Sequence, residues 1–445
     1  MNLGAFLKAR WEHTRNARRS RAEIEALQRT KFRRLVAHVN ERSPYYRDLI
    51  ASRGIDIATC APTDFPPLTK PALMENFDRI VTDPRISIAT VEQFLLKSQD
   101  SKDLLLDDYV VIHTSGTSGT IGYFVYSRAE RARRSALAIR TFPFSARRRR
   151  IAFFGIVSGH VGGATSIVET RGGLAKLRFD SRAFDIRSPF PQVIEGLNSF
   201  QPDILSGYPT VLRELANAQE SGELRISPAL LSVGGEPISA ENRAFFDRVF
   251  GAEISNHYGT SEHSLMGFGL SGDSGIYLFE DELIFEIGEG PPLVTNLFSY
   301  AQPLIRYAMD DVLEPVADPN PRFPFTKIRD IGDRPLPSPI FTNRHGKDDV
   351  IRWKKFTVFF APDVERIELR VLDKLSCVLR VRLRNGVTAT ERIRALAAVE
   401  TMLDNIFAEK EMENVSRRIE EVTSFGGDKA RVVVMPDMAN GSPTP

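Results

Sequence analysis

Apolar residues recur with helical spacing in the first part of the chain. One such set predicts an amphipathic helix that ends before Ser43-Pro44, and it consists of Ile24, Leu27, Phe32, Leu35, Val36 and Val39. The proline-rich segment FPPLTKPALMENF then predicts a turn that leads into another helix. Residues 1–100 are therefore predicted to form a helical opening.

The pattern changes from Asp108 onward, where short apolar runs are separated by Gly, Pro and Ser. These runs are VVIHTSG, IAFFGIV, ILSGYP, LLSVGG and AEISNHYG. Helical stretches such as PTVLRELANAQESG and SAENRAFFDRVFG lie between them. Strands that alternate with helices are the signature of an α/β architecture with a mainly parallel sheet.

The C-terminal part of the chain has a different pattern of apolar and polar residues. Around Gly288, the segment ELIFEIGEGPPLVTNLF and those that follow it to about Asp333 predict β-hairpins. Residues 346–445 combine short strands with one helix, ATERIRALAAVETMLDNIFAE, which predicts a small α+β domain whose tail, MANGSPTP, is disordered. We therefore expect two domains, a large multi-subdomain N-terminal body over 1–345 with a β-rich part, and a small domain over 346–445.

Composition narrows the functional classes. The 445 residues carry a formal net charge of only +2, which argues against nucleic acid as the main partner. Only Cys60 and Cys377 are present, which excludes a disulfide framework and a four-cysteine zinc site. The sequence shows no secretory signal and no membrane-spanning run, so we expect a cytoplasmic protein. The run Arg147–Arg150 predicts a solvated loop rather than a phosphate-binding patch.

The strongest chemical signal follows the predicted strand VVIH. It consists of the small residues Thr114, Ser115, Gly116, Thr117, Ser118 and Gly119. Such residues let the backbone approach an anion closely and supply many hydrogen-bond donors, which favours a polyphosphate ligand over a flexible Ser/Gly turn. The loop has no Gly-Lys-Ser/Thr of a Walker P-loop, and the chain has no G-x-S-x-G or H-E-x-x-H motif.

This loop resembles the phosphate loop of the adenylate-forming superfamily, which includes acyl-CoA synthetases, peptide-synthetase adenylation domains and luciferases. Three further motifs of that superfamily follow in the same order: Ser232–Pro237 (SVGGEP), His257–Glu262 (HYGTSE), and Pro303–Tyr307 (PLIRY) with Asp311. The opening LQRTKFRRLVAHVNERSPYYRDL and FPPLTK resembles the phenylacetate-CoA ligase branch and its capsule-biosynthesis relatives. The resemblance covers nearly the whole chain.

The resemblance implies a role for each matching residue of the large domain. Glu262 would bind Mg²⁺, Tyr258 would stack on adenine or substrate, and Asp311 would accept the ribose hydroxyls. His160, Gly234 and His257 would line the acyl pocket. Besides the phosphate loop, the implied ATP-binding set is Gly235, Glu236, Pro237, Tyr258, Gly259, Thr260, Ser261, Asp311 and Arg334.

The resemblance also implies that the small domain is a mobile lid that rotates between two half-reactions. Lys429, in the segment GGDKAR, would be the catalytic lysine of adenylation, and Asp348 would be the hinge. Two departures from the family pattern stand out: Thr120-Ile121-Gly122 replaces a Pro-Lys, and Ala308-Met309-Asp310 replaces an Arg-Thr-Gly.

The sequence therefore predicts a ligase that uses ATP and Mg²⁺ to activate a carboxylic acid, aryl or arylacetic, as an acyl-adenylate. A thiol, that of coenzyme A, would then accept the acyl group. One alternative transfers it to the phosphopantetheine of an acyl carrier protein or to a metabolite amine or hydroxyl. A second alternative is a degenerate nucleotide-binding member without turnover. The protein would be a monomer or a homodimer.

Overall fold

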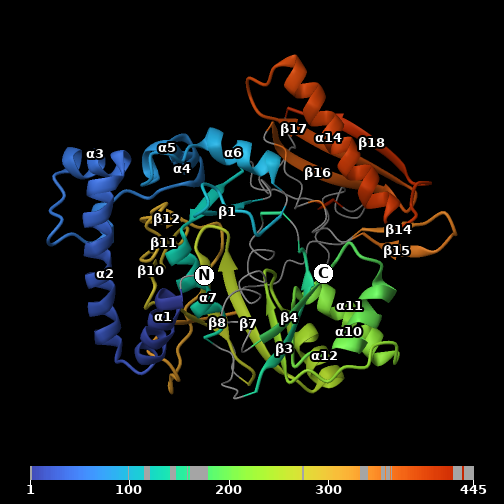
Figure 1. The fold of residues 1–445 in the computed structure, drawn as a ribbon, viewed down its shortest axis with the longest axis horizontal. Coiled ribbons are helices and arrows are strands. Elements are labelled where there is room, and N and C mark those ends of the chain that lie inside the picture. Colours follow the sequence, from blue (N-terminus) through green and yellow to red (C-terminus); the bar gives the residue numbers. More distant parts are fainter. Residues whose placement is uncertain are drawn as a thin grey trace. The chain divides into compact units, whose positions relative to one another are not determined.

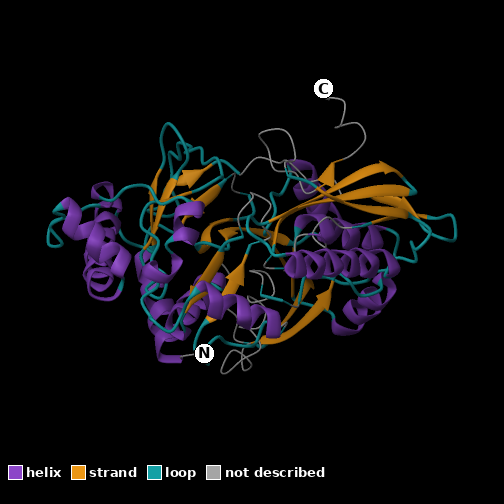
Figure 2. Ribbon diagram, turned by 90° about the horizontal axis from the view of Figure 1, so that it is seen from above, coloured by secondary structure: helices purple, strands orange, loops and turns teal. Residues whose placement is uncertain are grey.

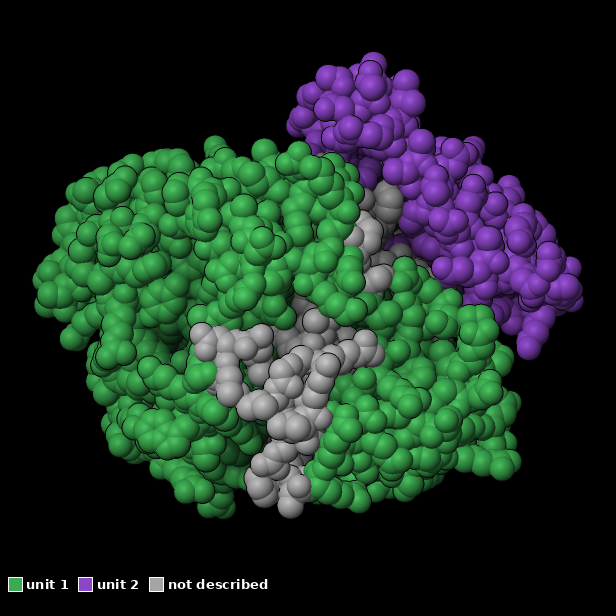
Figure 3. Space-filling view, in the orientation of Figure 1, with its two compact units in different colours: residues 1–112, 123–333 green, residues 113–122, 334–445 purple. Residues whose placement is uncertain are grey.

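The computed structural model describes residues 3–98, 100–114, 121–140, 147–157, 159–160, 179–272, 275–330, 339–351, 356, 361, 363–423 and 433–434. It divides into two compact units, residues 1–112 with 123–333, and residues 113–122 with 334–445 (Figure 3). The second unit thus begins before the boundary at 345/346 that the sequence predicts. Among the described helices, none combines the length and apolar character that a membrane crossing requires.

The N-terminal region is helical, as predicted (Figure 1). Ser20 and Glu23 form a capping box that starts the longest of these helices, and the predicted apolar residues lie on its buried side. Ser43 then caps the next helix, whose first residue is Pro44. The elements are α1 (Leu3–Asn16), α2 (Arg21–Arg42), α3 (Pro44–Arg53), η1 (Pro62–Asp64), α4 (Lys70–Glu75), α5 (Phe77–Ile80) and α6 (Ile88–Lys97).

The first unit is built on an eight-stranded sheet with the order β13-β9-β8-β7-β6-β5-β3-β4. Strands β4, β3, β5, β6 and β7 are parallel, whereas β8, β9 and β13 join in antiparallel fashion. The strands are β3 (Arg149–Gly155), β4 (Phe179–Asp185), β5 (Ile204–Gly207), β6 (Leu230–Gly234), β7 (Glu253–Thr260), β8 (Ser264–Gly269), β9 (Ile276–Leu278) and β13 (Lys327–Ile328).

Helices alternate with these strands, which confirms the predicted α/β class. They are α7 (Arg128–Ala138), α10 (Phe190–Phe200), α11 (Pro209–Glu220) and α12 (Ala240–Phe250), and helices flank the strands in Figure 2. In open α/β sheets, ligands bind beyond the carboxyl ends of the parallel strands. The predicted motifs SVGGEP and HYGTSE lie at the carboxyl ends of β6 and β7. The sheet therefore brings two predicted motifs to one edge.

One sequence-based expectation is wrong at the start of β3. The arginine run was expected to be a solvated loop, but Arg149 and Arg150 are the first residues of the strand. The neighbouring arginines form ion pairs, because Arg147 lies 3.2 Å from Asp203 and Arg148 lies 3.8 Å from Asp180. Strand pairing with β4 and β5 outweighs the charge of the run.

Smaller sheets complete the first unit. Strand β1 (Val110–His113) pairs with β2 (Tyr123–Tyr126), and both are buried along their length. The antiparallel sheet β10-β11-β12 consists of β10 (Leu283–Glu286), β11 (Leu293–Asn296) and β12 (Tyr307–Ala308). The hairpin β10–β11 lies within the segment ELIFEIGEGPPLVTNLF and confirms the predicted β-rich part.

The second unit is α+β, as predicted. Its main sheet has the order β18-β17-β16-β19, and buried residues of β16 and β17 pack with α14 in one apolar core. A Thr388–Glu391 capping box starts α14, and β16–β17 is an antiparallel pair. The elements are β14 (Ile340–Thr342), β15 (Asp348–Val350), β16 (Val364–Asp373), β17 (Ser376–Leu383), α14 (Ala389–Ala408), β18 (Ser416–Glu421) and β19 (Val433–Val434).

Candidate active site

The end of β6 requires glycine at two consecutive positions. Gly234 pairs with His257 of β7, and a Cβ at Gly234 would lie 2.9 Å from the carbonyl oxygen of His257. Gly235 has a φ of +74°, and a Cβ there would lie 3.0 Å from the ring of Tyr208. Both positions therefore require glycine, because a side chain there would meet the His257 backbone or the Tyr208 ring.

Glu236 connects the same turn to the following helix. Its Oε2 accepts hydrogen bonds from the Thr210 hydroxyl at 2.7 Å and from the Thr210 backbone N–H at 3.2 Å. Thr210 lies in the first turn of α11, whose orphan N–H groups favour a carboxylate. Oε2 of Glu236 thus holds the motif against α11. Pro237, the next residue, is half-buried.

Tyr258 and Asp311 are brought together by the fold. The Tyr258 hydroxyl donates a hydrogen bond of 2.7 Å to Oδ2 of Asp311, and the tyrosine is 8% exposed within the core. Burial is the main cause that raises the pKa of Asp311, and Asp310 adds to it, whereas the Tyr258 hydrogen bond opposes it. The arrangement leaves Oδ1 of Asp311 with no hydrogen bond from the described residues, so it can accept a further donor.

The segment that leads to Asp311 is held by an ion pair. Arg306, with a φ of 51°, donates to both oxygens of Glu286 at 2.8–3.1 Å and to the carbonyl of Phe65 at 2.7 Å. The next residue begins β12, which pairs with β11. These contacts fix the position of the backbone that precedes Asp311.

Gly259 and Thr260 are the last residues of β7, and Ser261 and Glu262 lie in the turn that follows before β8. The Tyr126 hydroxyl lies 2.8 Å from the carbonyl oxygens of both Ser261 and Glu262, which positions the turn. The Glu262 carboxylate receives no hydrogen bond from the described residues. It is largely buried, and one or two such carboxylates together with substrate phosphates are the usual ligands of Mg²⁺. The residue therefore fits the predicted metal role.

Lys70 was not among the predicted site residues, yet it lies next to Glu262. Its Nζ is 3.9 Å from Oε1 of Glu262, and the two side chains are 13% and 14% exposed. Burial lowers the pKa of Lys70, while Glu262 and Asp310 oppose this shift. Lys70 is the first residue of α4, after Thr69 as the N-cap. In the sequence, Lys70 stood out only as part of the FPPLTK segment that resembles the family. No local pattern connects it with Glu262, which lies far along the chain.

Two predicted acyl-pocket histidines are packed against neighbouring protein groups. His160 is buried, with Nε2 3.2 Å from Oγ of Ser98 and its ring 4.8 Å from that of Phe94. His257 has Nε2 3.1 Å from Oγ of Ser255, and burial lowers its pKa to about 4. Both contacts favour structural roles, and His257 is neutral at pH 7.

Several predicted residues lie outside the described part of the chain. They are Ser115, Gly116, Thr117, Ser118, Gly119, Arg334 and Lys429. Thr114 is described, and it closes the base of the loop, because its N–H donates to the Gly122 carbonyl at 2.9 Å and its Oγ1 accepts from the Gly122 N–H at 2.8 Å. Asp348 is exposed in β15 and contacts Oγ1 of Thr342 at 2.7 Å. Its role as a hinge stays a prediction.

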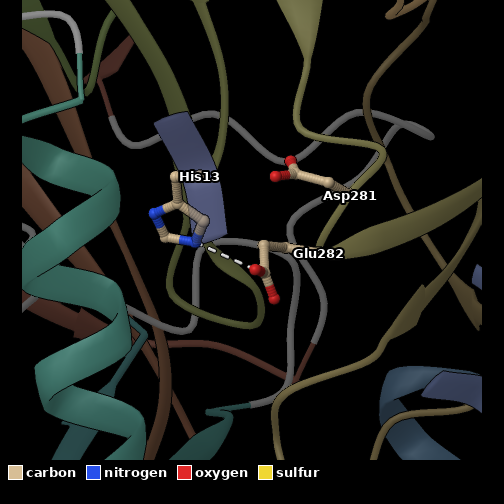
Figure 4. A group of neighbouring side chains, drawn as sticks. All are labelled: His13, Asp281 and Glu282. Atoms are coloured by element: carbon tan, nitrogen blue, oxygen red, sulfur yellow. Dashed lines mark hydrogen bonds and ion pairs between the residues drawn. The ribbon is translucent and has the colours of Figure 1, made fainter. Parts of the chain in front are cut away.

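A second acidic cluster is buried in the first unit, formed by His13, Asp281 and Glu282 (Figure 4). His13 Nε2 lies 2.9 Å from Glu282 Oε1, and cations surround both carboxylates. The donors to Glu282 are Lys31 at 3.1 Å and Arg133 at 2.6 and 2.7 Å, and the donors to Asp281 are Arg140 at 2.8 Å and Asn16 at 3.1 Å. All four oxygens are already satisfied, so the cluster is an ionic network and not a metal site.

The chain is similar to known proteins in sequence and in fold. No family model matches the sequence. Phenylacetate-coenzyme A ligase of Thermus thermophilus is 26% identical over 327 residues, 66% of this chain and 66% of that protein, so the chain matches just under two thirds of that relative. Indoleacetate–lysine synthetase of Pseudomonas savastanoi is 29% identical over 121 residues, 26% of this chain and 31% of the relative.

A solved structure covers far more of the chain. The structure of 2-hydroxyisobutyryl-CoA ligase with 2-HIB-AMP and CoA in the thioesterification state has a TM-score of 0.60 at 19% identity, over 95% of this chain and 91% of that one. The chain has the adenylate-forming CoA ligase fold. An open conformation of the same ligase gives a TM-score of 0.56 at 17% identity, over 92% and 91% of the two chains.

Proposed function

We propose that this protein uses ATP and Mg²⁺ to convert a carboxylic acid to an acyl-adenylate and then transfers the acyl group to the thiol of coenzyme A. The observation that carries the proposal is the pairing of Tyr258 with Asp311 beside Glu262 at the carboxyl end of β7. An aryl or arylacetic acid is the proposed substrate class, because a relative is a phenylacetate-coenzyme A ligase. A cytoplasmic location and a monomer or homodimer belong to the same proposal.

The first half-reaction brings two anions together, so the site must neutralise charge and hold the attacking oxygen in line. Glu262 would hold Mg²⁺, which supplies charge neutralisation at the phosphates when bound. Lys70, next to Glu262, would add a fixed positive charge. Oδ1 of Asp311, which does not bond to Tyr258, would accept a hydrogen bond from a ribose hydroxyl. Thr114 to Gly119 would lie around the phosphates, and Gly235, Glu236 and Pro237 on the adenine side.

The second unit would supply the remaining groups. We propose that residues 346–445 act as a mobile lid with Asp348 at the hinge, that Lys429 contacts the reacting carboxylate and α-phosphate during adenylation, and that Arg334 contacts ribose or phosphate. If so, Lys429→Ala loses carboxylate-dependent ATP–pyrophosphate exchange by about 100-fold or more yet still forms thioester from supplied acyl-adenylate. Unchanged exchange would contradict the assignment of Lys429.

The deciding experiment is a pyrophosphate-release screen over aryl, arylacetic and fatty acids, with and without coenzyme A. We expect release with an aryl or arylacetic acid, and formation of a thioester only when coenzyme A is added. Glu262→Gln serves as the matched control, and its release should be strongly reduced at the same protein concentration. Absence of release with every acid would overturn the proposal in favour of a nucleotide-binding protein without turnover.

A different acceptor is the second candidate. One relative is an indoleacetate–lysine synthetase, and its name gives an amine as the acceptor. We propose as the alternative that the acyl group goes to an amine, a hydroxyl or the phosphopantetheine of a carrier protein. Mass spectrometry of the products with coenzyme A, lysine or a carrier protein that bears a free phosphopantetheine thiol distinguishes these cases, because each acceptor gains the mass of the acyl group.

A further inference from the structure

Helix α1 has two faces of opposite character. Its inner face carries Ala9, His13 and Asn16, which are buried, and His13 and Asn16 bond to Glu282 and Asp281. This network fixes the helix to the body of the first unit. The opposite, outer face of α1 is therefore held pointing away from the body of the first unit.

The outer face displays two large apolar side chains. Leu7 is 55% exposed and Trp11, one turn later, is 60% exposed. The guanidinium of Arg15 lies 4.6 Å from the centre of the Trp11 ring, and Lys8 is exposed beside them. An exposed tryptophan and leucine surrounded by cations is the composition of helices that lie in a lipid–water interface.

The charge of this region is strongly positive. Residues 1–42 contain eleven Lys or Arg and four Glu, a net charge of +7, whereas the whole chain carries +2. The rest of the chain is therefore net negative, at −5. In the described part of the chain, no acidic side chain forms an ion pair with Lys8, Arg15 or Arg18. These cations are available to an external anionic surface.

We propose that the outer face of α1, formed by Leu7, Lys8, Trp11 and Arg15 with Arg18 after the helix, docks peripherally on an anionic lipid surface. The Trp11 ring and Leu7 enter the headgroup region, and the cations contact lipid phosphates. A second copy of the chain fits less well, because a twofold interface here would bring the same cations of both copies together. Nucleic acid would leave Leu7 without an apolar environment.

Vesicle co-sedimentation of the full chain tests the proposal. We expect binding to phosphatidylcholine vesicles that contain roughly 30 mol % phosphatidylglycerol and little binding to pure phosphatidylcholine. Raising the salt from about 50 to about 500 mM should weaken binding to the anionic vesicles by about tenfold or more. Equal binding to both kinds of vesicle, or no binding, overturns the proposal.

Matched variants separate the apolar contribution to vesicle binding from the electrostatic one. Leu7→Ser with Trp11→Ser, and separately Lys8→Gln with Arg15→Gln and Arg18→Gln, should each reduce binding to anionic vesicles by about tenfold. The control is Leu96→Ser in α6, because Leu96 is 57% exposed but lies on another helix. An effect of the control as large as that of the α1 variants contradicts the assignment of the surface. Activity without vesicles should be the same in all variants, so this test does not depend on the proposed reaction.

Fluorescence and competition complete the test. The difference between the emission spectra of the wild type and Trp11→Phe should shift to shorter wavelength when anionic vesicles are added, because the indole leaves water. Stronger binding to RNA than to the vesicles would identify a nucleic-acid surface. A dimer that Trp11→Ser converts to a monomer would identify a self-association surface. Either result overturns the proposal.

Discussion

Two glutamates of the first unit lie beside a lysine, yet their surroundings differ: Glu282 is fully buried, and the side chain of Glu262 is 14% exposed. Glu282 has Lys31 at 3.1 Å, Arg133 at 2.6 and 2.7 Å and His13 at 2.9 Å. Glu262 has Lys70 at 3.9 Å, and its carboxylate accepts no hydrogen bond from the described residues. The charge of Glu282 is fully compensated by its partners, whereas the Glu262 carboxylate can still bind a ligand.

The difference shows how burial alone fails to identify a site. A buried carboxylate with all its partners is part of the folded structure, and removing it leaves cations uncompensated. A buried carboxylate with incomplete partners retains free lone pairs for a hard cation. The number of donors at each oxygen, rather than the type of residue, separates the ionic network from the candidate active site.

The largest expected effect is on stability. Glu282→Gln should lower the free energy of unfolding by about 3–5 kcal/mol, because Lys31 and Arg133 lose their counter-charge in a buried site. Chemical denaturation measures this change. Glu25→Gln is the control, because its ion pair with Arg21 is exposed and should matter by less than about 1 kcal/mol. A loss at Glu282 as small as that of the control would mean that the network is not structural.

The second effect is on activity. Glu262→Gln should reduce ATP–pyrophosphate exchange by about 100-fold and raise the Mg²⁺ concentration needed for half-maximal rate, because a charged ligand of the metal becomes neutral. Its free energy of unfolding should change by less than about 1 kcal/mol, in contrast to Glu282→Gln. An unaltered dependence on Mg²⁺ would count against Glu262 as the ligand.

Tyr258→Phe should have a smaller effect. It removes the hydroxyl that donates to Asp311, so we expect about a tenfold higher KM for ATP with a smaller change in kcat, since the loss corresponds to one buried hydrogen bond. Steady-state kinetics measure both constants. Tyr277→Phe is the matched control, because its hydroxyl donates to Asp318, which belongs to no predicted motif. A similar change in both variants would argue for a general effect on packing.

The smallest expected effect is on the pH dependence of stability, which compares the buried carboxyl groups of Glu282 and Asp311. Burial opposes ionisation of Glu282, but Lys31, Arg133 and His13 outweigh it and hold its pKa well below the usual value. Its contribution is therefore present above the unfolded-state pKa and is lost as the pH falls through the lower folded-state pKa. The pKa of Asp311 is raised, so its contribution has the opposite sign and improves stability as the pH falls.

Denaturation at a series of pH values below about 5 separates these signs. The Glu282→Gln variant should lose stability less steeply than the wild type as the pH falls, because it lacks the group that must be protonated. The Asp311→Asn variant should lose it more steeply than the wild type. Parallel curves for all three proteins would show that neither carboxyl group governs acid stability.

Local patterns were sufficient for much of the fold. The apolar spacing before Ser43-Pro44 predicted α2, and the capping residues Ser20 and Glu23 are visible in the sequence. The alternation of short buried runs with helices predicted the parallel sheet. By contrast, the start of β3 at Arg149 was missed, because the charge of the arginine run concealed a strand that pairs with two neighbours.

The sequence by itself determined the α/β class, the α+β second unit and the order of the four family motifs, because each depends on residues close together in the chain. Only the tertiary structure decided which side chains meet. Tyr258 reaches Asp311 across 53 positions, His13 reaches Glu282 across 269, and Lys70 of α4 lies beside Glu262. Such contacts depend on how strands and helices pack, and local spacing carries no information about them.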